Sequence, residues 1–463
     1  MKTVILLIGL LFSTFSLQAQ DYEDVMSEAY WKIWNSDVQA SINKNIEQYR
    51  KGDAELNIPS GVTVKIEQLS HSFIFGGNIF LFGQLETTQQ NRQYENTFGA
   101  LFNSATLPFY WKTLEPEQGK PRYTAGSSYI FRRPPVDPIL EFCESNKIMT
   151  KGHAIIYGMR RWGHPDWMPS DRKEMEFYFE KHIQELALRY KDRIQIWDVV
   201  NEPVDQANRG IMPDDYTYKS YKWAMKYFPE SVIFNINDID FKSGIPYTRR
   251  YVEIARNMID RGIRIDNVGA QMHIFNPVEA QKIAEGDNIL TPAKLTDVVD
   301  CLNEVGRPVH VSEVTVCAPD STSIGSAIQA VIAENLYRFW FSCPNITGIT
   351  WWNVVDGGGA PGEPSYSGLY DKRMRKKPVY ETLDRLINRE WKTSLTTTSN
   401  AQGVVRFRGF KGHYRATWIN KNGSDKNYSF SIFTEKPNDT VHLFESAIDL
   451  LSYATLQKLE GKE

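Results

Sequence analysis

The sequence predicts an α/β fold, a TIM (β/α)8 barrel over residues 73–390 with a small C-terminal β module. Short apolar strands alternate with longer amphipathic segments through residues 73–390, and this alternation is typical of a parallel sheet. Seven or eight such units fit a closed barrel better than an open doubly wound sheet. No GxGxxG motif follows an early strand, so a dinucleotide-binding fold has no support in the sequence.

The barrel elements follow one another along the chain, and several strands end in polar or charged residues. The clearest strands are expected at residues 148–154, 194–201, 232–235, 267–271, 309–313 and 346–352. Amphipathic helices are expected at residues 172–190, 247–261, 292–305 and 324–340. Because TIM barrels carry their functional groups at the carboxyl ends of strands, those polar residues are the candidates for a site.

The chain before the barrel divides into two parts. Residues 1–20 combine the positive Lys2, a mainly apolar run and the small Ala19, which together predict a secretory signal peptide. Residues 21–72 are expected to form a helix at 24–50 and a strand at 62–69, where apolar and polar residues alternate. We therefore expect a secreted or periplasmic protein.

After the barrel, residues 391–463 are expected to form the β module and a C-terminal tail. Residues 396–403 are expected to form a loop-rich junction, and two strands at 404–410 and 414–419 are expected to pair around a turn at Gly412. We also expect the module to pair with the strand at 62–69, which would join the two ends of the chain. Residues 440–463 are expected to be helical or frayed.

Bulk composition excludes some classes of partner. The 463 residues carry 53 basic and 56 acidic side chains, so the net charge of −3 provides no excess of positive charge for nucleic acid. No apolar run is long enough to span a membrane, and we expect a monomer. The four cysteines are widely spaced without a CxxC pair, so we expect no metal site; disulfides are permitted by export, but buried free thiols are favoured.

Two of the predicted strands each have a glutamate at the carboxyl end. Glu202 follows the strand at 194–201 and precedes Pro203, which ends the strand because proline cannot donate to the ladder. Glu313 follows Ser312 on the strand at 309–313. We count these strands as the fourth and seventh, so the two carboxyl groups are expected to face each other across the barrel mouth. A protonated and an ionised carboxyl group flanking one bond are what glycosidic cleavage requires.

Two further strands bring side chains to the same mouth. Gln271 and His273 alternate with Met272, so both can point to one side, where a His could hold Glu313 ionised and oriented. Of the adjacent Trp351 and Trp352, one must face inward, where it could form an apolar wall beneath a sugar ring. Packing between barrel and helices is the alternative for both.

These segments together resemble glycoside hydrolase family 10, the family of retaining endo-β-1,4-xylanases, and the chain is identified as a divergent member. The matching segments are Asn201-Glu202-Pro203, Ser312-Glu313, Gln271-x-His273, Trp352, Gly152-His153, Glu115-Pro116 with Gly119, Asn237-Asp238, and Gly368-Leu369-Tyr370-Asp371. The resemblance implies Glu202 as general acid/base and Glu313 as nucleophile, without a metal or organic cofactor. It implies a polysaccharide or oligosaccharide substrate contacted by Asn201 at a sugar 2-hydroxyl, and by His153, Gln271, His273, Trp352 and Tyr157.

The sequence departs from this family around the sugar-binding surface. The family carries a Glu-Asn-x-x-Lys stretch before Trp111, whereas this chain has Thr106-Leu107-Pro108-Phe109-Tyr110. Tyr157-Gly158 replaces a Trp-His pair, and residues 357–361 (Gly-Gly-Gly-Ala-Pro) replace a second Trp. Arg160, Arg161 and Trp162 are candidates for replacement contacts, and paired guanidinium groups suit an acidic sugar. Two alternatives to a xylanase stay open, a retaining glycosidase for another β-linked or acidic glycan and a catalytically silent glycan-binding barrel.

Overall fold

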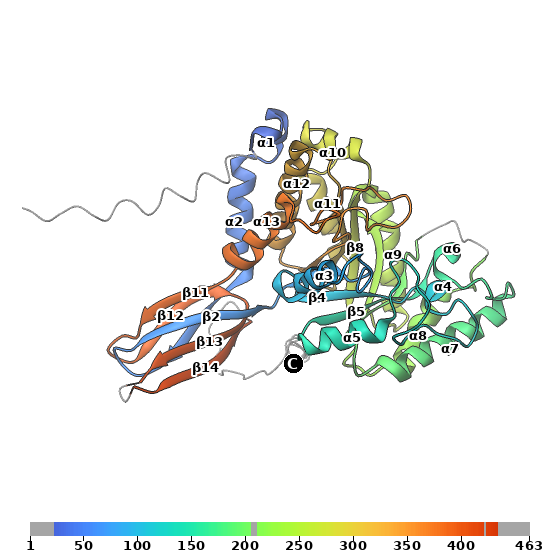
Figure 1. Cartoon of the computed structure of the whole chain (residues 1–463), viewed down its shortest axis with the longest axis horizontal. Coiled ribbons are helices and arrows are strands. Elements are labelled where there is room, and N and C mark those ends of the chain that lie inside the picture. The colour runs from blue at the N-terminus through green and yellow to red at the C-terminus, as the bar shows by residue number, and fades with distance from the viewer. Residues whose placement is uncertain (1–22, 205–210, 421–422, 434–463) are drawn as a thin grey trace, which may run out of the picture.

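Eight parallel strands close into a barrel in the computed structural model, which describes residues 23–204, 211–420 and 423–433 (Figure 1). The barrel strands are β3 (Ile74–Asn78), β4 (Ser104–Pro108), β5 (Met149–Tyr157), β6 (Ile196–Asn201), β7 (Ile233–Asp240), β8 (Asn267–Ile274), β9 (Val309–Val316) and β10 (Ile346–Trp351). They are hydrogen-bonded in chain order, with β10 closing onto β3. The predicted TIM barrel is confirmed, and β6 and β9 are its fourth and seventh strands.

Helices follow the strands and cover the outside of the barrel (Figure 1). They are α3 (Thr88–Ala100), α4 (Trp111–Leu114), α5 (Val136–Ser145), α6 (Arg160–Gly163), α7 (Arg172–Tyr190), α8 (Tyr216–Tyr227), α9 (Ile245–Asp260), α10 (Pro277–Ala284), α11 (Pro292–Asn303), α12 (Ser323–Ser342) and α13 (Pro378–Arg385). The amphipathic α7 illustrates why these segments form helices that pack on the barrel. Asp171 caps its first turn by accepting from two backbone amides, and Met175, Phe179 and Ile183 recur on the buried face. Short 3-10 turns at Glu23–Val25 and Phe241–Ser243 and a π-helical turn at Leu386–Glu390 complete the helical elements of the described chain.

The β module is built from both ends of the described chain. A four-stranded sheet runs β11 (Ser394–Thr398), β2 (Thr63–His71), β13 (Gly412–Ile419) and β14 (Asp425–Ile432), and a two-stranded sheet joins β1 (Lys51–Asn57) to β12 (Val404–Phe410). The expected pairing of the strand near 62–69 with the C-terminal module is therefore confirmed. The two sheets enclose a core of their own, formed by Ala54, Leu56, Ile58, Val64, Ile66, Val405, Tyr414, Ala416, Phe430 and Ile432.

Two predictions about this module were wrong. β12 pairs with β1, and β13 pairs with β2 and β14, so β12 and β13 do not form the expected hairpin. Only Lys411 separates the two strands, which is too short for a two-residue hairpin turn, so the chain crosses from one sheet to the other. Residues 394–398, assigned in part to a loop, form β11 against β2.

Two N-terminal helices, α1 (Glu28–Ile33) and α2 (Ser36–Arg50), connect the β module to the barrel (Figure 1). The Asn335 side chain of α12 donates to the Tyr30 hydroxyl over 2.8 Å and accepts from Gln39 over 2.8 Å. At the end of α2, the Arg50 guanidinium donates to the carbonyls of Phe341, Cys343 and Ile346. Because these bonds hold the last residue before β1, they fix the module against the barrel.

Several predictions concern residues outside this description or features of the whole chain. The predicted signal peptide at 1–20 and the predicted tail at 440–463 lie outside the described residues. Within the described ranges, no helix combines the length and apolarity that crossing a membrane requires. Cys143, Cys301 and Cys317 are buried and Cys343 is half-buried, each as a free thiol.

Candidate active site

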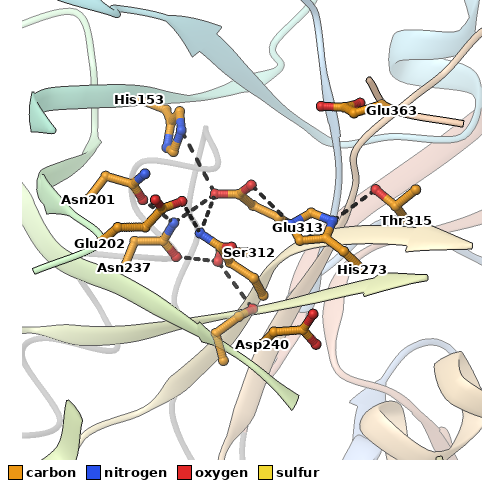
Figure 2. A network of polar contacts seen from close by, with 12 residues as sticks. His153, Asn201, Glu202, Asn237, Asp240, His273, Ser312, Glu313, Thr315 and Glu363 are labelled. Carbon is orange, nitrogen blue, oxygen red and sulfur yellow. Dashed lines mark hydrogen bonds and ion pairs between the residues drawn. The ribbon is translucent and has the colours of Figure 1, made fainter. Parts of the chain in front are cut away.

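Glu202 and Glu313 face each other at the mouth of the barrel (Figure 2). Gln271 Nε2 lies 3.3 Å from Glu202 Oε1 and 3.2 Å from Glu313 Oε1, so these two oxygens are at most 6.5 Å apart. Retaining glycosidases separate their carboxyl groups by about 5–5.5 Å and inverting ones by about 6.5–9.5 Å. The arrangement therefore favours the retaining geometry.

The backbone explains how each glutamate reaches the mouth. Glu202 follows the buried strand β6 in the left-handed conformation, with φ of 54°, and its amide donates to the Asn237 carbonyl over 2.7 Å. A non-glycine residue held there is a strained position of the kind found at functional sites. Glu313 lies within β9, which continues to Val316 beyond the predicted end at 313, and its register partner on β8 is Gln271.

The two carboxyl groups have opposite electrostatic environments. Burial raises the pKa of Glu202 to about 7, and the charges of Glu313 and Asp238 add to this effect. Burial also opposes ionisation of Glu313, but the hydrogen bond with His273 and the positive potential of His153 and Lys151 outweigh it, so the pKa of Glu313 lies below its usual value. Near neutral pH, Glu313 is therefore ionised while Glu202 carries its proton for a large part of the time.

Donors surround Glu313 on both of its oxygens. His273 Nε2 lies 3.4 Å from Oε2, and Asn237 Nδ2 donates to Oε1 over 2.8 Å. His273 Nδ1 contacts the Thr315 hydroxyl at 2.9 Å, which fixes the ring orientation. Gln271 and His273 thus reach the same carboxylate, as the alternation along β8 predicts.

Asn237 is the residue of this site that sequence reasoning left without a role. Its Nδ2 donates both hydrogens, one to Glu313 and one to Asn201 Oδ1 over 2.7 Å, while its Oδ1 accepts from Ser312. A fully bonded amide of this kind fixes the positions of Asn201 and Glu313 together. The resemblance of Asn237-Asp238, just after the predicted strand at 232–235, to the family's segment was the signal that identified it as a motif residue.

His153 connects the nucleophile side to a buried charge pair. Its Nδ1 lies 2.6 Å from Asp198 Oδ2, which also pairs with Lys151 Nζ at 3.0 Å, and its Nε2 lies 3.8 Å from Glu313 Oε1. Burial disfavours the Asp198 charge, but Lys151 and His153 more than compensate and lower the pKa of Asp198. Asp198 therefore orients the imidazole toward the mouth.

The remaining predicted contacts also lie at the mouth. Tyr157 shares a hydrogen bond with Glu202. The Trp352 ring packs edge-on against His153 at 5.4 Å between centroids and against Phe80 at 5.3 Å. Trp351 instead packs outward near Tyr337 of α12, so Trp352 is the inward-facing member of the pair.

The structure does not join the predicted pair Arg160 and Arg161 into one anion site. Arg160 donates to the Met168 carbonyl over 2.9 Å, and the exposed Arg161 stacks on Trp162 at 4.8 Å. Their roles stay a prediction. Among the described residues, no group of three or more His, Cys, Asp and Glu side chains is arranged to hold a metal ion.

A family model described as glycosyl hydrolase family 10 matches residues 71–385. The chain belongs to this family. A similar relative is endo-1,4-beta-xylanase B of Thermotoga neapolitana, 23% identical over 61% of this chain and 79% of the relative. Another is anti-sigma-I factor RsgI6 of Acetivibrio thermocellus, 23% identical over 84% of this chain but only 48% of the relative.

Solved family 10 structures share the barrel. Native xylanase 10B from Thermotoga maritima matches with a TM-score of 0.56 at 19% identity, covering 69% of this chain and 96% of that one. Xylanase 10B from Thermotoga petrophila, solved with xylobiose, matches with a TM-score of 0.56 at 20% identity, covering 69% and 95%. These likenesses support the fold; the chemistry rests on the geometry of the family 10 site in this chain.

Proposed function

We propose that this protein is a retaining endo-β-1,4-glycanase that hydrolyses a xylan-type polysaccharide. Family 10 membership and the relatives named as xylanases support this substrate class. The observation that carries the proposal is the single Gln271 amide that reaches both Glu202 and Glu313, two carboxyl groups with opposite pKa shifts.

The chemistry follows from those two protonation states. Glu202 protonates the glycosidic oxygen while the ionised Glu313 attacks the anomeric carbon, which forms a covalent glycosyl-enzyme. Glu202, now ionised, takes a proton from water, and the water attacks the same carbon and releases Glu313. Asn201, whose Oδ1 is held by Asn237, keeps its Nδ2 as a donor for the sugar 2-hydroxyl.

The order in which product anomers appear tests this proposal. We expect hydrolysis of xylohexaose, followed by proton NMR, to give the β-anomer first, because two displacements restore the configuration. The α-anomer appearing first would contradict a retaining mechanism. Absence of hydrolysis on a panel of β-linked glycans, with binding retained, would favour a catalytically silent barrel.

We also propose that the protein is exported. The support is the sequence pattern of residues 1–20 alone. Expression in a bacterial host with N-terminal analysis of the product is expected to give a chain beginning at Gln20 or Asp21. A product that keeps Met1 and stays in the cytoplasm would contradict export.

A further inference from the structure

The stretch that lacks the family's sugar-binding residues carries a different group of side chains. The family lysine directly before Trp111 is replaced by Tyr110, whose hydroxyl lies 3.1 Å from His153 Nε2. The Arg133 guanidinium covers the Tyr110 ring, with its central carbon 3.8 Å from the ring centroid. The cation absent from position 110 is thus present beside it, on a residue of the loop after α4.

This arginine is placed by an ordered loop. Within residues 115–135, the buried Arg122 donates to the carbonyls of Thr113 at 2.8 Å, Ser128 at 3.0 Å and Arg133 at 3.0 Å. Arg133 also lies 5.2 Å from the Phe80 ring, and Phe80 packs against Trp352. Arg133 therefore borders the aromatic surface that includes Trp352.

Among the described residues, the guanidinium groups of Arg132 and Arg133 have a single carboxylate, that of Glu363, close to both of them. The neighbouring Arg132 pairs with Glu363 at 3.3 Å, and Glu363 is also held by Asn353 at 2.7 Å, so that carboxylate has its own cation. Arg133 donates one bond, from Nη1 to the Arg132 carbonyl, and its Nε is buried with no hydrogen-bond partner in the described structure. Burial lowers the pKa of Arg133 to about 10, so the group is still cationic at neutral pH.

We propose that Arg133, stacked on Tyr110 beside the Arg132–Glu363 pair, forms a subsite for the carboxylate of an acidic sugar unit bound next to the sugar over Trp352. A guanidinium with free donors binds a carboxylate through paired hydrogen bonds, and stacking on an aromatic ring holds its plane. A partly desolvated cation gains more from such a partner than from a neutral hydroxyl. This proposal rests on the proposed function in one respect, that a sugar unit of the substrate binds over Trp352.

The experiment compares ligands that differ in one charge. The probes are xylotetraose with one glucuronic acid substituent, the same oligosaccharide with the acid converted to its amide, and a β-1,4-linked glucuronic acid tetramer. Binding is measured by calorimetry on the wild type and on E313Q, and hydrolysis is measured on the wild type. We expect either the glucuronic acid-substituted xylotetraose or the glucuronic acid tetramer to bind at least tenfold more tightly than the amide form of the substituted xylotetraose. This difference in affinity is expected to decrease as salt is added. The tetramer distinguishes an acidic backbone from an acidic branch.

Arg133 variants identify the residue responsible. In both R133M and R133Q, the ratio of the affinity for the acidic probe to the affinity for the amide is expected to fall below threefold. Because both affinities are measured on the same variant, a general loss of affinity cancels in this ratio. R161M is the matched comparison on the other candidate arginine and is expected to keep the wild-type ratio. A wild-type ratio near one, a ratio that survives both Arg133 variants, or a ratio lost only in R161M would overturn the subsite. Acid-selective binding without any hydrolysis would instead overturn the proposed function and leave the subsite standing.

Discussion

The ends of β6 and β9 present the same type of residue in opposite surroundings. Glu202 at the end of β6 is partly buried and has carboxylates as its charged neighbours, and its pKa rises to about 7. Glu313 on β9 is more deeply buried but faces His273, Asn237 and His153, and its pKa falls. The difference shows that the donors and charges around a carboxyl group, rather than its burial alone, assign its role.

The largest expected effects come from removing each carboxyl group. E313A is expected to lower kcat by about 10,000-fold or more, since no covalent intermediate can form. E202A is expected to lower it by about 100- to 10,000-fold, the range for loss of general acid/base help. Steady-state kinetics on xylohexaose measures both.

Azide and an activated aryl xyloside separate the two roles. With a leaving group that needs no proton, azide is expected to restore activity in E202A by attacking the glycosyl-enzyme, which gives the β-xylosyl azide after two displacements. In E313A, azide can act only by direct attack from the space that the carboxylate leaves, which gives the α-xylosyl azide. The β-azide from E313A and the α-azide from E202A would reverse the assignment.

The next effect concerns Asn237 as a positioning residue. N237A removes one donor from Glu313 and the restraint on Asn201, so we expect about a 100-fold loss of kcat/KM. Because the lost hydrogen bond stabilised the charged form of Glu313, the acidic limb of the pH profile should move to higher pH. N267A, at a buried asparagine at the start of β8, is the matched control for general disturbance of the barrel. An acidic limb that moves equally in both variants would contradict the specific role of Asn237.

The pH dependence of the wild type gives a smaller effect. The general acid must be protonated, so kcat/KM is expected to decrease above a pKa near 7, the value that burial and Glu313 give Glu202. The profile in the free enzyme is measured at low substrate concentration. A basic limb that begins near 4.5, the ordinary value for this group, would contradict the environment described here.

The smallest effect is on stability, and its sign differs between the two glutamates. The pKa of Glu202 is higher in the folded than in the unfolded state, so the folded state loses stability as pH rises from about 4.5 to about 7. E202Q is then expected to be more stable than the wild type at pH 8, by about 3 kcal/mol, and equal at pH 4. The pKa of Glu313 is lowered, so its ionised form contributes stability above its unfolded pKa that is lost as pH falls; E313Q should be less stable than the wild type at pH 8. Thermal unfolding at both pH values checks this, and shifts of the same sign would contradict it.

The sequence predicted the barrel and the two glutamates because both depend on local signals. Apolar strands that alternate with amphipathic helices specify a parallel sheet, and Pro203 fixes the end of β6 beside Glu202. The limits of β8 and β9 were predicted less well, because polar residues, such as His273 in β8 and Glu313 in β9, lie inside these strands and reach the site.

Some features that depend on long-range contacts were missed. The alternation in 404–410 and 414–419 identified two strands, and the pairing of the module with 62–69 was expected. The pairing of β12 with β1 was not, since a period of two does not specify which strand lies alongside. Arg133 was missed because it lies in a loop without periodicity, and only the anchoring by Arg122 brings it over Tyr110. The predicted arginines at 160 and 161 had the right chemistry for an acidic sugar, but the structure engages one with a carbonyl and the other with Trp162.

Trapping the covalent intermediate tests the division of roles most directly. An activated 2-deoxy-2-fluoro-β-xylobioside slows both displacements but leaves the second slower, so the glycosyl-enzyme accumulates and can be located by peptide mass spectrometry. The account predicts one added 2-deoxy-2-fluoroxylobiosyl unit, attached to the peptide at Glu313, and no labelling in E313Q. Label on Glu202 or on another residue, or hydrolysis without any trapped intermediate, would contradict it.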